Sequence, residues 1–131
     1  MKTTQRIFIF ECNSNTYGDC IQKSLFGSNL PWPLQVKAGD LCFLYHYEVN
    51  TMFGIWLADC EGARNLIPKA WGGKFPFQVR VKLISHEIEE VPEAIVMSLS
   101  TNNSNGRLNN LLNMELADEL LKWASGKAKL E

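Results

Sequence analysis

The chain has 131 residues, of which 46% are hydrophobic, and its formal net charge is −1 at neutral pH. This length suits a single domain, covering residues 1–131, with a core large enough to need no disulfide bonds. The near-neutral charge argues against a protein that binds nucleic acid through a strongly basic surface, while a local basic patch stays compatible with it.

Four cysteines occur, at positions 12, 20, 42 and 60, and no two of them form a Cys-x-x-Cys pair. Each falls in an apolar or helical context, which is typical of buried, reduced thiols. Because the cytosol keeps thiols reduced, we predict a cytoplasmic protein. The two histidines lack metal-ligand spacing and no glycine-rich phosphate loop is present, so we predict neither a metal nor a cofactor.

The N-terminal apolar run is short and ends at Glu11. It is too short for a signal peptide or a membrane span, so we expect no membrane partner. Residues 6–10 are instead predicted to form the first strand, since they favour β-structure. The following helix is predicted to begin at Thr16, which stands three residues before Asp19 as in a capping box, and to end at Gly27.

A central hairpin is predicted after a proline-containing loop at residues 28–35. Residues 41–47 are apolar on both faces at their start, which indicates a central strand. A short polar loop leads to a second strand at residues 52–60, as expected for an antiparallel hairpin. Gly54 lies inside this strand, where glycine often marks a bulge or a close backbone approach.

An irregular crossover, residues 61–73, leads to a third predicted strand at residues 77–85. This strand alternates between apolar and polar residues, which suits an antiparallel sheet or small barrel. The side chains expected to face the core are Phe77, Val79, Val81 and Leu83. Those expected to face outward are Gln78, Arg80 and Lys82.

The C-terminal part contains two further predicted elements. Residues 94–99 are predicted as a weaker strand, and residues 114–124 as the final helix because they carry an apolar stripe at helical spacing. The stripe consists of Ala117, Leu120, Leu121 and Ala124.

No catalytic motif appears in the chain, but aromatic and basic residues gather in suggestive places. Large aromatics in loops or at element ends either plug the end of a barrel or line a pocket; these are Phe26, Trp32 and Trp71. Basic residues near the crossover and the third strand either contact phosphates or form an ordinary exposed face; these are Lys69, Lys74, Arg80 and Lys82.

Three blocks of sequence carry a family resemblance: NTYGDCIQKSLFG, VKAGDLCFLYHYEVNTMFGIW and NLIPKAWGGKFPFQVRVK. In this order, over about residues 6–85, they resemble the DCD (development and cell death) domain. The layout also resembles the wider PUA-like group, which includes EVE and YTH domains. The resemblance implies an α+β fold, a partly open mixed or antiparallel β-barrel flanked by helices.

Several members of the PUA-like group recognise RNA or modified bases in an aromatic pocket at the barrel mouth. The resemblance implies that Phe26 and Trp71 are pocket aromatics, although YTH domains have tryptophan where Phe26 stands. It also implies that Cys12 and Asn13, just after the first strand, contact the base.

Taken together, these patterns predict a noncatalytic domain that recognises a nucleotide, with a modified base in RNA or DNA as the expected ligand. The residues predicted to hold the nucleic-acid backbone are Lys74, Arg80 and Lys82. One alternative is a protein–protein interaction module of a stress or cell-death pathway. A weaker alternative is an enzyme that acts on a nucleotide. The oligomeric state is not determined by these patterns.

Overall fold

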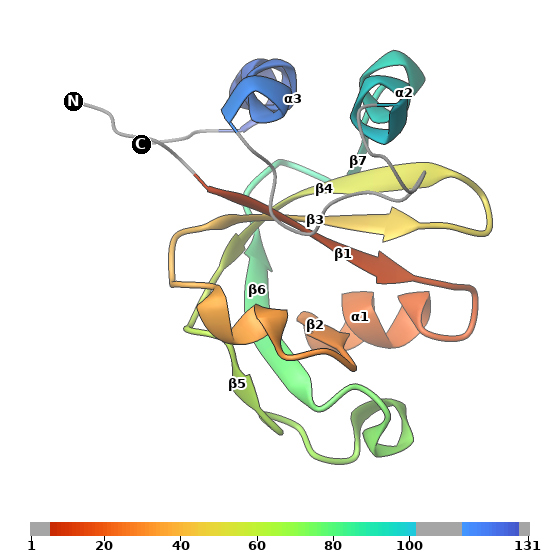
Figure 1. The fold of residues 1–131 in the computed structure, drawn as a ribbon, viewed down its shortest axis with the longest axis vertical. Coiled ribbons are helices and arrows are strands. Elements are labelled where there is room, and N and C mark those ends of the chain that lie inside the picture. Colours follow the sequence, from red (N-terminus) through yellow and green to blue (C-terminus); the bar gives the residue numbers. More distant parts are fainter. Residues whose placement is uncertain (1–5, 102–113, 129–131) are drawn as a thin grey trace.

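The computed structural model describes residues 6–101 and 114–128. In this part of the chain seven strands form one curled sheet, and helices flank it (Figure 1). The strands are β1 (Ile7–Cys12), β2 (Leu25–Ser28), β3 (Leu41–His46), β4 (Thr51–Ala58), β5 (Ala63–Arg64), β6 (Phe77–Leu83) and β7 (Glu89–Glu90). The α-helices are α1 (Tyr17–Lys23), α2 (Glu93–Thr101) and α3 (Met114–Lys127). Two 3-10 helices, η1 (Trp32–Gln35) and η2 (Ala70–Gly73), lie in the connections.

The sheet has the strand order β1-β3-β4-β6-β2, with β5 paired to β6 and β7 paired to β4. The β1–β3 pair is parallel, whereas β3–β4, β4–β6 and β6–β2 are antiparallel. The three strands predicted from the central region are therefore adjacent and antiparallel, as expected. The sheet curls until β2 approaches β1, but no strand pairing between these two is found among the described residues. The prediction of a partly open mixed barrel flanked by helices is confirmed.

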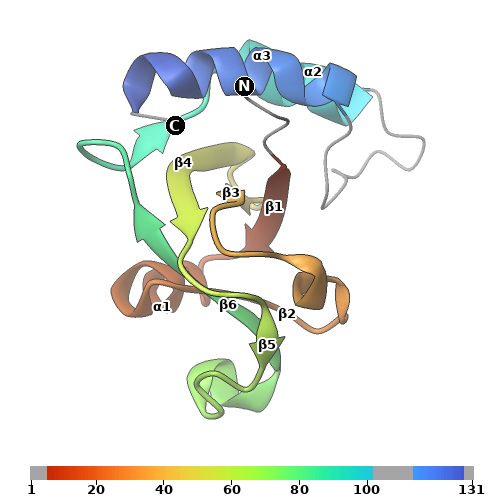
Figure 2. The same cartoon turned by 90° about the vertical axis from the view of Figure 1, so that its left-hand side faces the viewer.

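Strands β1 and β3 are buried on both faces, and this gives the domain two apolar clusters. Helices α2 and α3 cover the outer face of the sheet (Figure 2), where Ile9, Phe43 and Leu120 belong to one cluster. The barrel interior holds the other cluster, which includes Phe10 and Leu44. Successive residues of a strand point to opposite faces, so each strand supplies both clusters. The central position predicted for residues 41–47 is confirmed.

Gly54 provides the close approach that its position in the second strand predicts. A Cβ atom on Gly54 would lie 2.5 Å from the ring of Phe43, so no larger residue fits without moving that ring. The register between β3 and β4 shifts between Cys42 and Leu44, next to the same ring. The absence of a side chain at residue 54 thus lets the Phe43 ring fill the core beneath β4.

The prediction of a strand at residues 94–99 is wrong, because these residues lie in α2. Val96 and Leu99 stand three residues apart and are both buried against the sheet, which is helical spacing. The backbone N–H groups of Ile95 and Val96 donate to the carbonyl of Pro92 and close the first turn. A short apolar run does not by itself distinguish a strand from a buried helix face.

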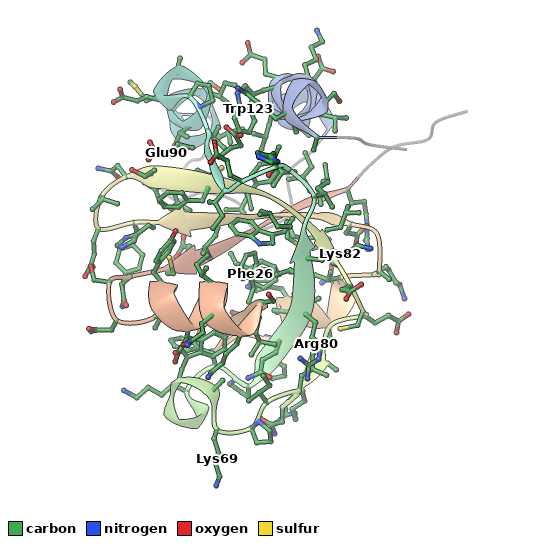
Figure 3. All side chains as sticks on the ribbon, turned by 180° about the vertical axis from the view of Figure 1, so that it is seen from behind. Phe26, Lys69, Arg80, Lys82, Glu90 and Trp123 are labelled. Atoms are coloured by element: carbon green, nitrogen blue, oxygen red, sulfur yellow. The ribbon has the colours of Figure 1, made fainter. Side chains whose placement is uncertain are left out.

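Strand β6 follows the predicted alternation except at its ends. Val79 and Val81 are buried, whereas Arg80 and Lys82 are exposed on the side seen in Figure 3. Gln78, which was expected to face outward, is completely buried. Leu83, expected to face the core, is 38% exposed. Gln78 is buried because the crossover folds over it and bonds to its side chain, and Leu83 is the last residue of β6.

Helix α1 ends at Lys23, four residues before the predicted stop at Gly27. Ser24 takes a left-handed conformation, φ 50° and ψ 49°, and its N–H donates to the carbonyls of Cys20 and Ile21. The chain then continues directly as β2, which pairs with β6 through Gly27 itself. A strand therefore occupies the segment that was expected to be the end of the helix.

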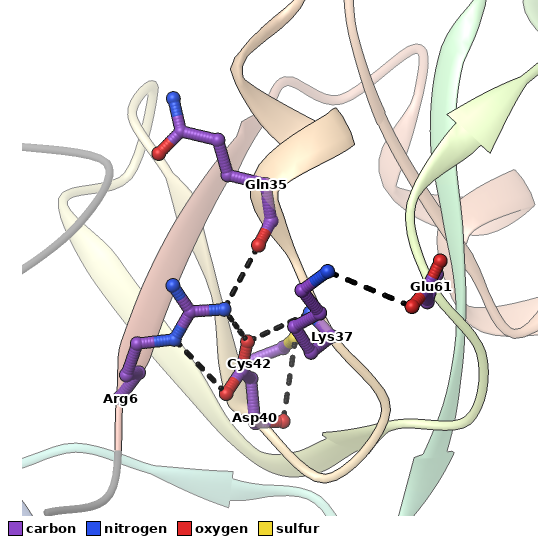
Figure 4. A network of polar contacts seen from close by, with 6 residues as sticks. All are labelled: Arg6, Gln35, Lys37, Asp40, Cys42 and Glu61. Carbon is purple, nitrogen blue, oxygen red and sulfur yellow. Dashed lines mark hydrogen bonds and ion pairs between the residues drawn. The ribbon is translucent and has the colours of Figure 1, made fainter.

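An ion pair joins the starts of β1 and β3 (Figure 4). Arg6 donates through Nη2 to Asp40 Oδ2 at 2.7 Å and through Nε to Asp40 Oδ1 at 3.3 Å. The same Nη2 donates to the carbonyl of Gln35 at 2.8 Å, and the N–H of Lys37 donates to Asp40 Oδ2 at 2.8 Å. Bidentate ion pairs of this kind orient their partners as well as attracting them. The pair therefore fixes the first residues of β1 and β3 relative to each other.

We expect replacement of Leu120 by alanine to destabilise the domain by about 2–5 kcal/mol, because Leu120 is fully buried between α3 and the sheet. Replacement of the exposed Glu119 on the same helix by alanine is the matched control and should change the free energy of unfolding by less than about 0.5 kcal/mol. Urea unfolding of both variants measures the difference. Equal midpoints for the two variants would contradict docking of α3 on the sheet.

Candidate functional site

A pocket opens at the seam of the barrel, where β1 and β2 approach each other without pairing. Its volume is 240 Å³. The polar residues of its lining are Glu11, Asn13, Thr16, Ser28, Asn29 and Tyr47. The apolar residues are Cys12, Gly27, Leu30, Trp32 and Phe75. The end of β1, the loop after it, β2 and the start of η1 thus converge on one concave surface.

The loop after β1 is shaped by the side chain of Asn13. Its Oδ1 accepts hydrogen bonds from the N–H groups of Asn15 at 2.9 Å and Thr16 at 3.1 Å, a local turn that asparagine favours. Its own N–H donates to Thr16 Oγ1 at 3.0 Å. Thr16 occupies the predicted N-cap position of α1, but its side chain makes no capping bond to the helix. The order of this loop therefore depends on Asn13.

Two hydrogen-bonded contacts tie this loop to the turn between β3 and β4. Asn13 Nδ2 donates to Tyr47 Oη at 3.1 Å. Ser14 donates to Glu48 Oε1 from its backbone N–H at 2.8 Å and from its hydroxyl at 2.7 Å. The Ser14 hydroxyl and then the Ser14 N–H lower the pKa of Glu48, which stays ionised at neutral pH. The loop after β1, which forms one wall of the pocket, is thus fixed by hydrogen bonds to two residues of the turn after β3.

Trp32 forms the apolar wall on the side of η1. Its ring packs on Phe10 with a centroid distance of 4.5 Å and lies parallel to Phe8 at 6.0 Å. Prolines at positions 31 and 33 flank it and restrict the backbone of the turn. The half-buried indole therefore packs against the barrel core and also forms part of the pocket lining. The sequence left open whether Trp32 plugs the end of the barrel or lines a pocket, and in the structure it does both.

Trp71 lines a second, smaller cavity of 20 Å³ beside the pocket. Its ring stands edge-on to Phe75 at a centroid distance of 5.7 Å, and its Nε1 donates to the carbonyl of Thr16 at 3.4 Å. The Trp71 backbone is left-handed, φ 52° and ψ 32°, which is uncommon for a large residue. A Cβ atom on Gly27 would lie 2.7 Å from the Trp71 ring, so the glycine leaves room for it.

Buried Gln78 fixes the crossover that carries Trp71 and Phe75. Its Oε1 accepts from the N–H of Ile67 at 2.8 Å. Its Nε2 donates to the carbonyl of Phe75 at 3.0 Å and to that of Ile67 at 3.2 Å. A buried amide with all these partners orders the loop around it. Gln78 thus positions Phe75 at the pocket without lining the pocket itself.

The structure brings together most of the predicted base-binding residues. Cys12 and Asn13 line the pocket, and Trp71 lines the smaller cavity next to it. The prediction for Phe26 is wrong, because this ring is completely buried between Phe10 and Trp56. The early end of α1 is the reason, since β2 carries Phe26 into the barrel interior.

The three predicted backbone-binding cations lie outside both linings. Lys74, Arg80 and Lys82 are exposed, and Lys74 directly precedes the pocket residue Phe75. Arg80 and Lys82 extend from the outer face of β6 (Figure 3). Sequence reasoning missed Tyr47 as a pocket residue, because it was assigned to the end of a buried strand. The structure places it in the turn after β3, where it is 48% exposed.

Cys12 is unsuited to nucleophilic chemistry despite its place in the pocket. Burial raises its pKa from the ordinary value of 9.0 to about 12, with smaller contributions from the negative charges of Glu48 and Glu11. The thiolate is the reactive form of cysteine, so at neutral pH this thiol is protonated. Among the described residues, no group of His, Cys, Asp and Glu could hold a metal ion.

Comparison with known proteins identifies the family. Residues 6–122 match the Development and cell death domain. The chain belongs to this family. A DCD domain-containing protein of Glycine max, NRP-B, is 36% identical over 84 residues, which cover 56% of this chain and 26% of that protein. In the relatives matched, the aligned part amounts to 23% to 46% of their length.

Solved structures of YTH domains share the fold of this DCD domain. The complex of the YTH domain-containing protein Mmi1 with RNA has a TM-score of 0.69 at 13% identity and covers 91% of this chain and 80% of that chain. The Pho92 YTH domain in complex with m6A has a TM-score of 0.63 at 12% identity and covers 94% and 85%. The resemblance to DCD and YTH domains is confirmed. No helix in residues 6–101 and 114–128 is long and apolar enough to span a membrane.

The buried thiols predict a loss of stability in alkali. Burial raises the pKa of Cys12, Cys20 and Cys42 in the folded state. As the pH rises past their ordinary pKa of 9.0, the thiols of the unfolded chain lose protons first, which favours unfolding. The stability that these thiols contribute is therefore complete below about pH 8 and declines above about pH 9.

Replacement of Cys42, which is fully buried, by alanine should make this decline shallower by about 1.4 kcal/mol per pH unit above about pH 9. Urea unfolding of both proteins between about pH 7.5 and pH 10.5 gives the two slopes. Other groups titrate equally in both proteins, so the difference isolates the Cys42 thiol. Parallel pH profiles would show that Cys42 does not remain protonated in the folded state.

Proposed function

We propose that this DCD domain is a noncatalytic binding domain that takes a single nucleobase of RNA into the seam pocket. The observation that carries the proposal is the composition of the pocket. Trp32, Tyr47 and Phe75 offer aromatic surface, and polar side chains stand around them. The volume of 240 Å³ is below the roughly 300 Å³ at which pockets for drug-sized ligands begin, which suits one base better than a longer segment.

YTH domains with bound ligands support the same ligand class. Mmi1 was solved with RNA and the Pho92 domain with m6A. Both share the fold of this chain. An unstacked base of single-stranded RNA has the aromatic and polar edges that a small, aromatic-lined cavity can bind. Stacking on an aromatic ring contributes about 1–3 kcal/mol per base and does not need a basic protein.

The exposed cations complete the proposal. Lys74 next to Phe75, and Arg80 and Lys82 on β6, would contact phosphates of the strand outside the pocket. Such contacts position a nucleic acid without reading its sequence. The protonated Cys12 thiol is not available as a nucleophile at neutral pH, which supports binding without catalysis. We further propose a cytoplasmic location, where free thiols persist.

A second candidate function is a protein-interaction surface. Large apolar side chains are exposed in two segments that contribute to the pocket lining: Leu30 and Leu34 lie before and within η1, and Tyr47 and Val49 lie in the turn after β3. Clustered exposed apolar residues are typical of interaction sites. Replacing Leu34 and Val49 by serine separates the two functions, because neither residue lines the pocket. Loss of a protein partner with intact RNA binding in this variant would favour the interaction surface.

Replacement of Tyr47 by alanine should weaken binding of a short single-stranded RNA by about 5- to 150-fold, since it removes a ring on which a base could stack. Stability should change little because the ring is half exposed. Tyr47→Phe keeps the ring and removes only the acceptor of the Asn13 hydrogen bond, so it should bind more tightly than Tyr47→Ala. Fluorescence anisotropy measures the affinities.

Val49→Ala is the matched control for the tyrosine variants. Val49 is 57% exposed, lies in the same turn and is not part of the pocket lining. It should bind RNA like the unmodified domain. If folded Tyr47→Ala binds as tightly as the Val49→Ala control, the pocket is not where the base binds.

Replacement of Lys74 by alanine should weaken RNA binding and reduce the slope of log Kd against log salt by about 0.7, the value for one phosphate contact to a single strand. Lys122→Ala is the control, since Lys122 is exposed on α3 and pairs with Asp118 at 3.4 Å. Binding isotherms at four salt concentrations give both slopes. An unchanged slope in Lys74→Ala would remove Lys74 from the interface.

A further inference from the structure

The exposed side chain of Arg64 lies over an aromatic ring. Its Cζ is 4.7 Å from the centroid of the Phe77 ring, which is half-buried at the start of β6. Arg6 also lies over a ring, that of Phe8, but its guanidinium is bound to Asp40 at the start of β3. Arg64 is instead held over its ring at the surface, where a ligand can reach it.

Strand pairing places Arg64 beside the seam pocket. Phe77 is the register partner of both Arg64 on β5 and Ser28 on β2, and Ser28 lines the pocket. Directly opposed residues of antiparallel strands have their side chains on the same face of the sheet. Neighbouring strands are about 4.8 Å apart, so the backbone of Arg64 lies roughly 10 Å from that of Ser28.

A second contact brings β5 against the wall of the pocket. β5 begins directly after Gly62, and a Cβ atom on Gly62 would overlap the carbonyl oxygen of Pro33. The backbone of η1 therefore lies against the residue that precedes β5. The first residue of η1 is Trp32, which belongs to the pocket lining. Register and packing thus both place Arg64 next to the pocket.

We propose that Arg64 and Phe77 form a second subsite, in which the RNA nucleotide next to the base in the pocket stacks on the guanidinium of Arg64. This inference rests on the proposed function. Bases of single-stranded RNA stack on guanidinium planes as well as on aromatic rings. The Phe77 ring holds the guanidinium in place, because a cation is attracted to the face of an aromatic ring. Stacking is tolerant of sequence, so the subsite accepts any neighbouring base.

Replacement of Arg64 by alanine should raise the Kd for hexaribonucleotides of mixed sequence by about 5-fold or more, as expected for the loss of one stacked base. Fluorescence anisotropy measures the Kd, and thermal melting checks that the variant is folded. Lys122→Ala is the charge-matched control, since α3 and β5 lie at opposite ends of the domain (Figure 2). Equal Kd values for the two variants would overturn the second subsite.

Arg64→Lys separates stacking from a simple phosphate contact. Lysine keeps the positive charge and lacks the planar surface of the guanidinium. Stacking predicts that the Kd of Arg64→Lys is close to that of Arg64→Ala. If Arg64→Lys binds as tightly as the unmodified domain, residue 64 acts through its charge and the stacking subsite is wrong.

A double variant tests whether the pocket and the second subsite hold different nucleotides. Residues that share no partner contribute nearly independently. The fold-losses of Tyr47→Ala and Arg64→Ala should therefore multiply in the double variant. A double variant that binds no more weakly than Tyr47→Ala would place both residues on one nucleotide and overturn the second subsite.

The failure of this inference is distinguishable from the failure of the proposed function. If Tyr47→Ala weakens binding of the hexaribonucleotides while Arg64→Ala does not, the second subsite is wrong and base binding in the pocket stands. If the unmodified domain binds no RNA, or if folded Tyr47→Ala binds it unchanged, the proposed function fails.

Discussion

The burial of β1 on both of its faces is the constraint on which the rest of the structure depends. Its alternate residues enter two different apolar clusters, one under α2 and α3 and one inside the barrel. Pairing with β3 on one side satisfies that edge, and the ion pair of Arg6 with Asp40 sets where the two strands begin. On its other side β1 faces β2 across the unpaired seam. The pocket exists because the sheet curls almost to closure at this point and then stops.

Polar side chains, rather than regular secondary structure, give the pocket its shape. Asn13 orders the loop after β1, and Glu48 connects that loop to the turn after β3. Gln78, buried beneath the crossover, holds the backbone beside Phe75. Each of these groups satisfies backbone donors or acceptors that strands and helices leave open, and a buried polar group without partners would destabilise the fold. The walls are therefore ordered before any ligand arrives.

Some aromatic residues pack in the barrel interior, and others lie at the unpaired seam between β1 and β2. Phe26 fills the interior between Phe10 and Trp56, whereas Trp32 packs on Phe10 and also reaches the pocket. Trp71 covers Gly27, which has no side chain to displace it. The same residue type thus packs in the core or lines the pocket according to the distance of its strand or turn from the open seam, and that distance is a property of the folded sheet.

The sequence by itself determined the central sheet, because alternation of apolar residues places Val79 and Val81 inward and Arg80 and Lys82 outward whatever surrounds them. The apolar stripe of α3 followed from an equally local pattern, whereas the positions of Cys12 and Asn13 at the site came from the family resemblance. Only the tertiary structure decided that residues 94–99 are helical, that Gln78 is buried and that Phe26 belongs to the core. Those outcomes depend on which segment folds over each residue. Contacts between segments distant in the chain decide the burial of these residues, and the periodicity of their own segments does not specify those contacts.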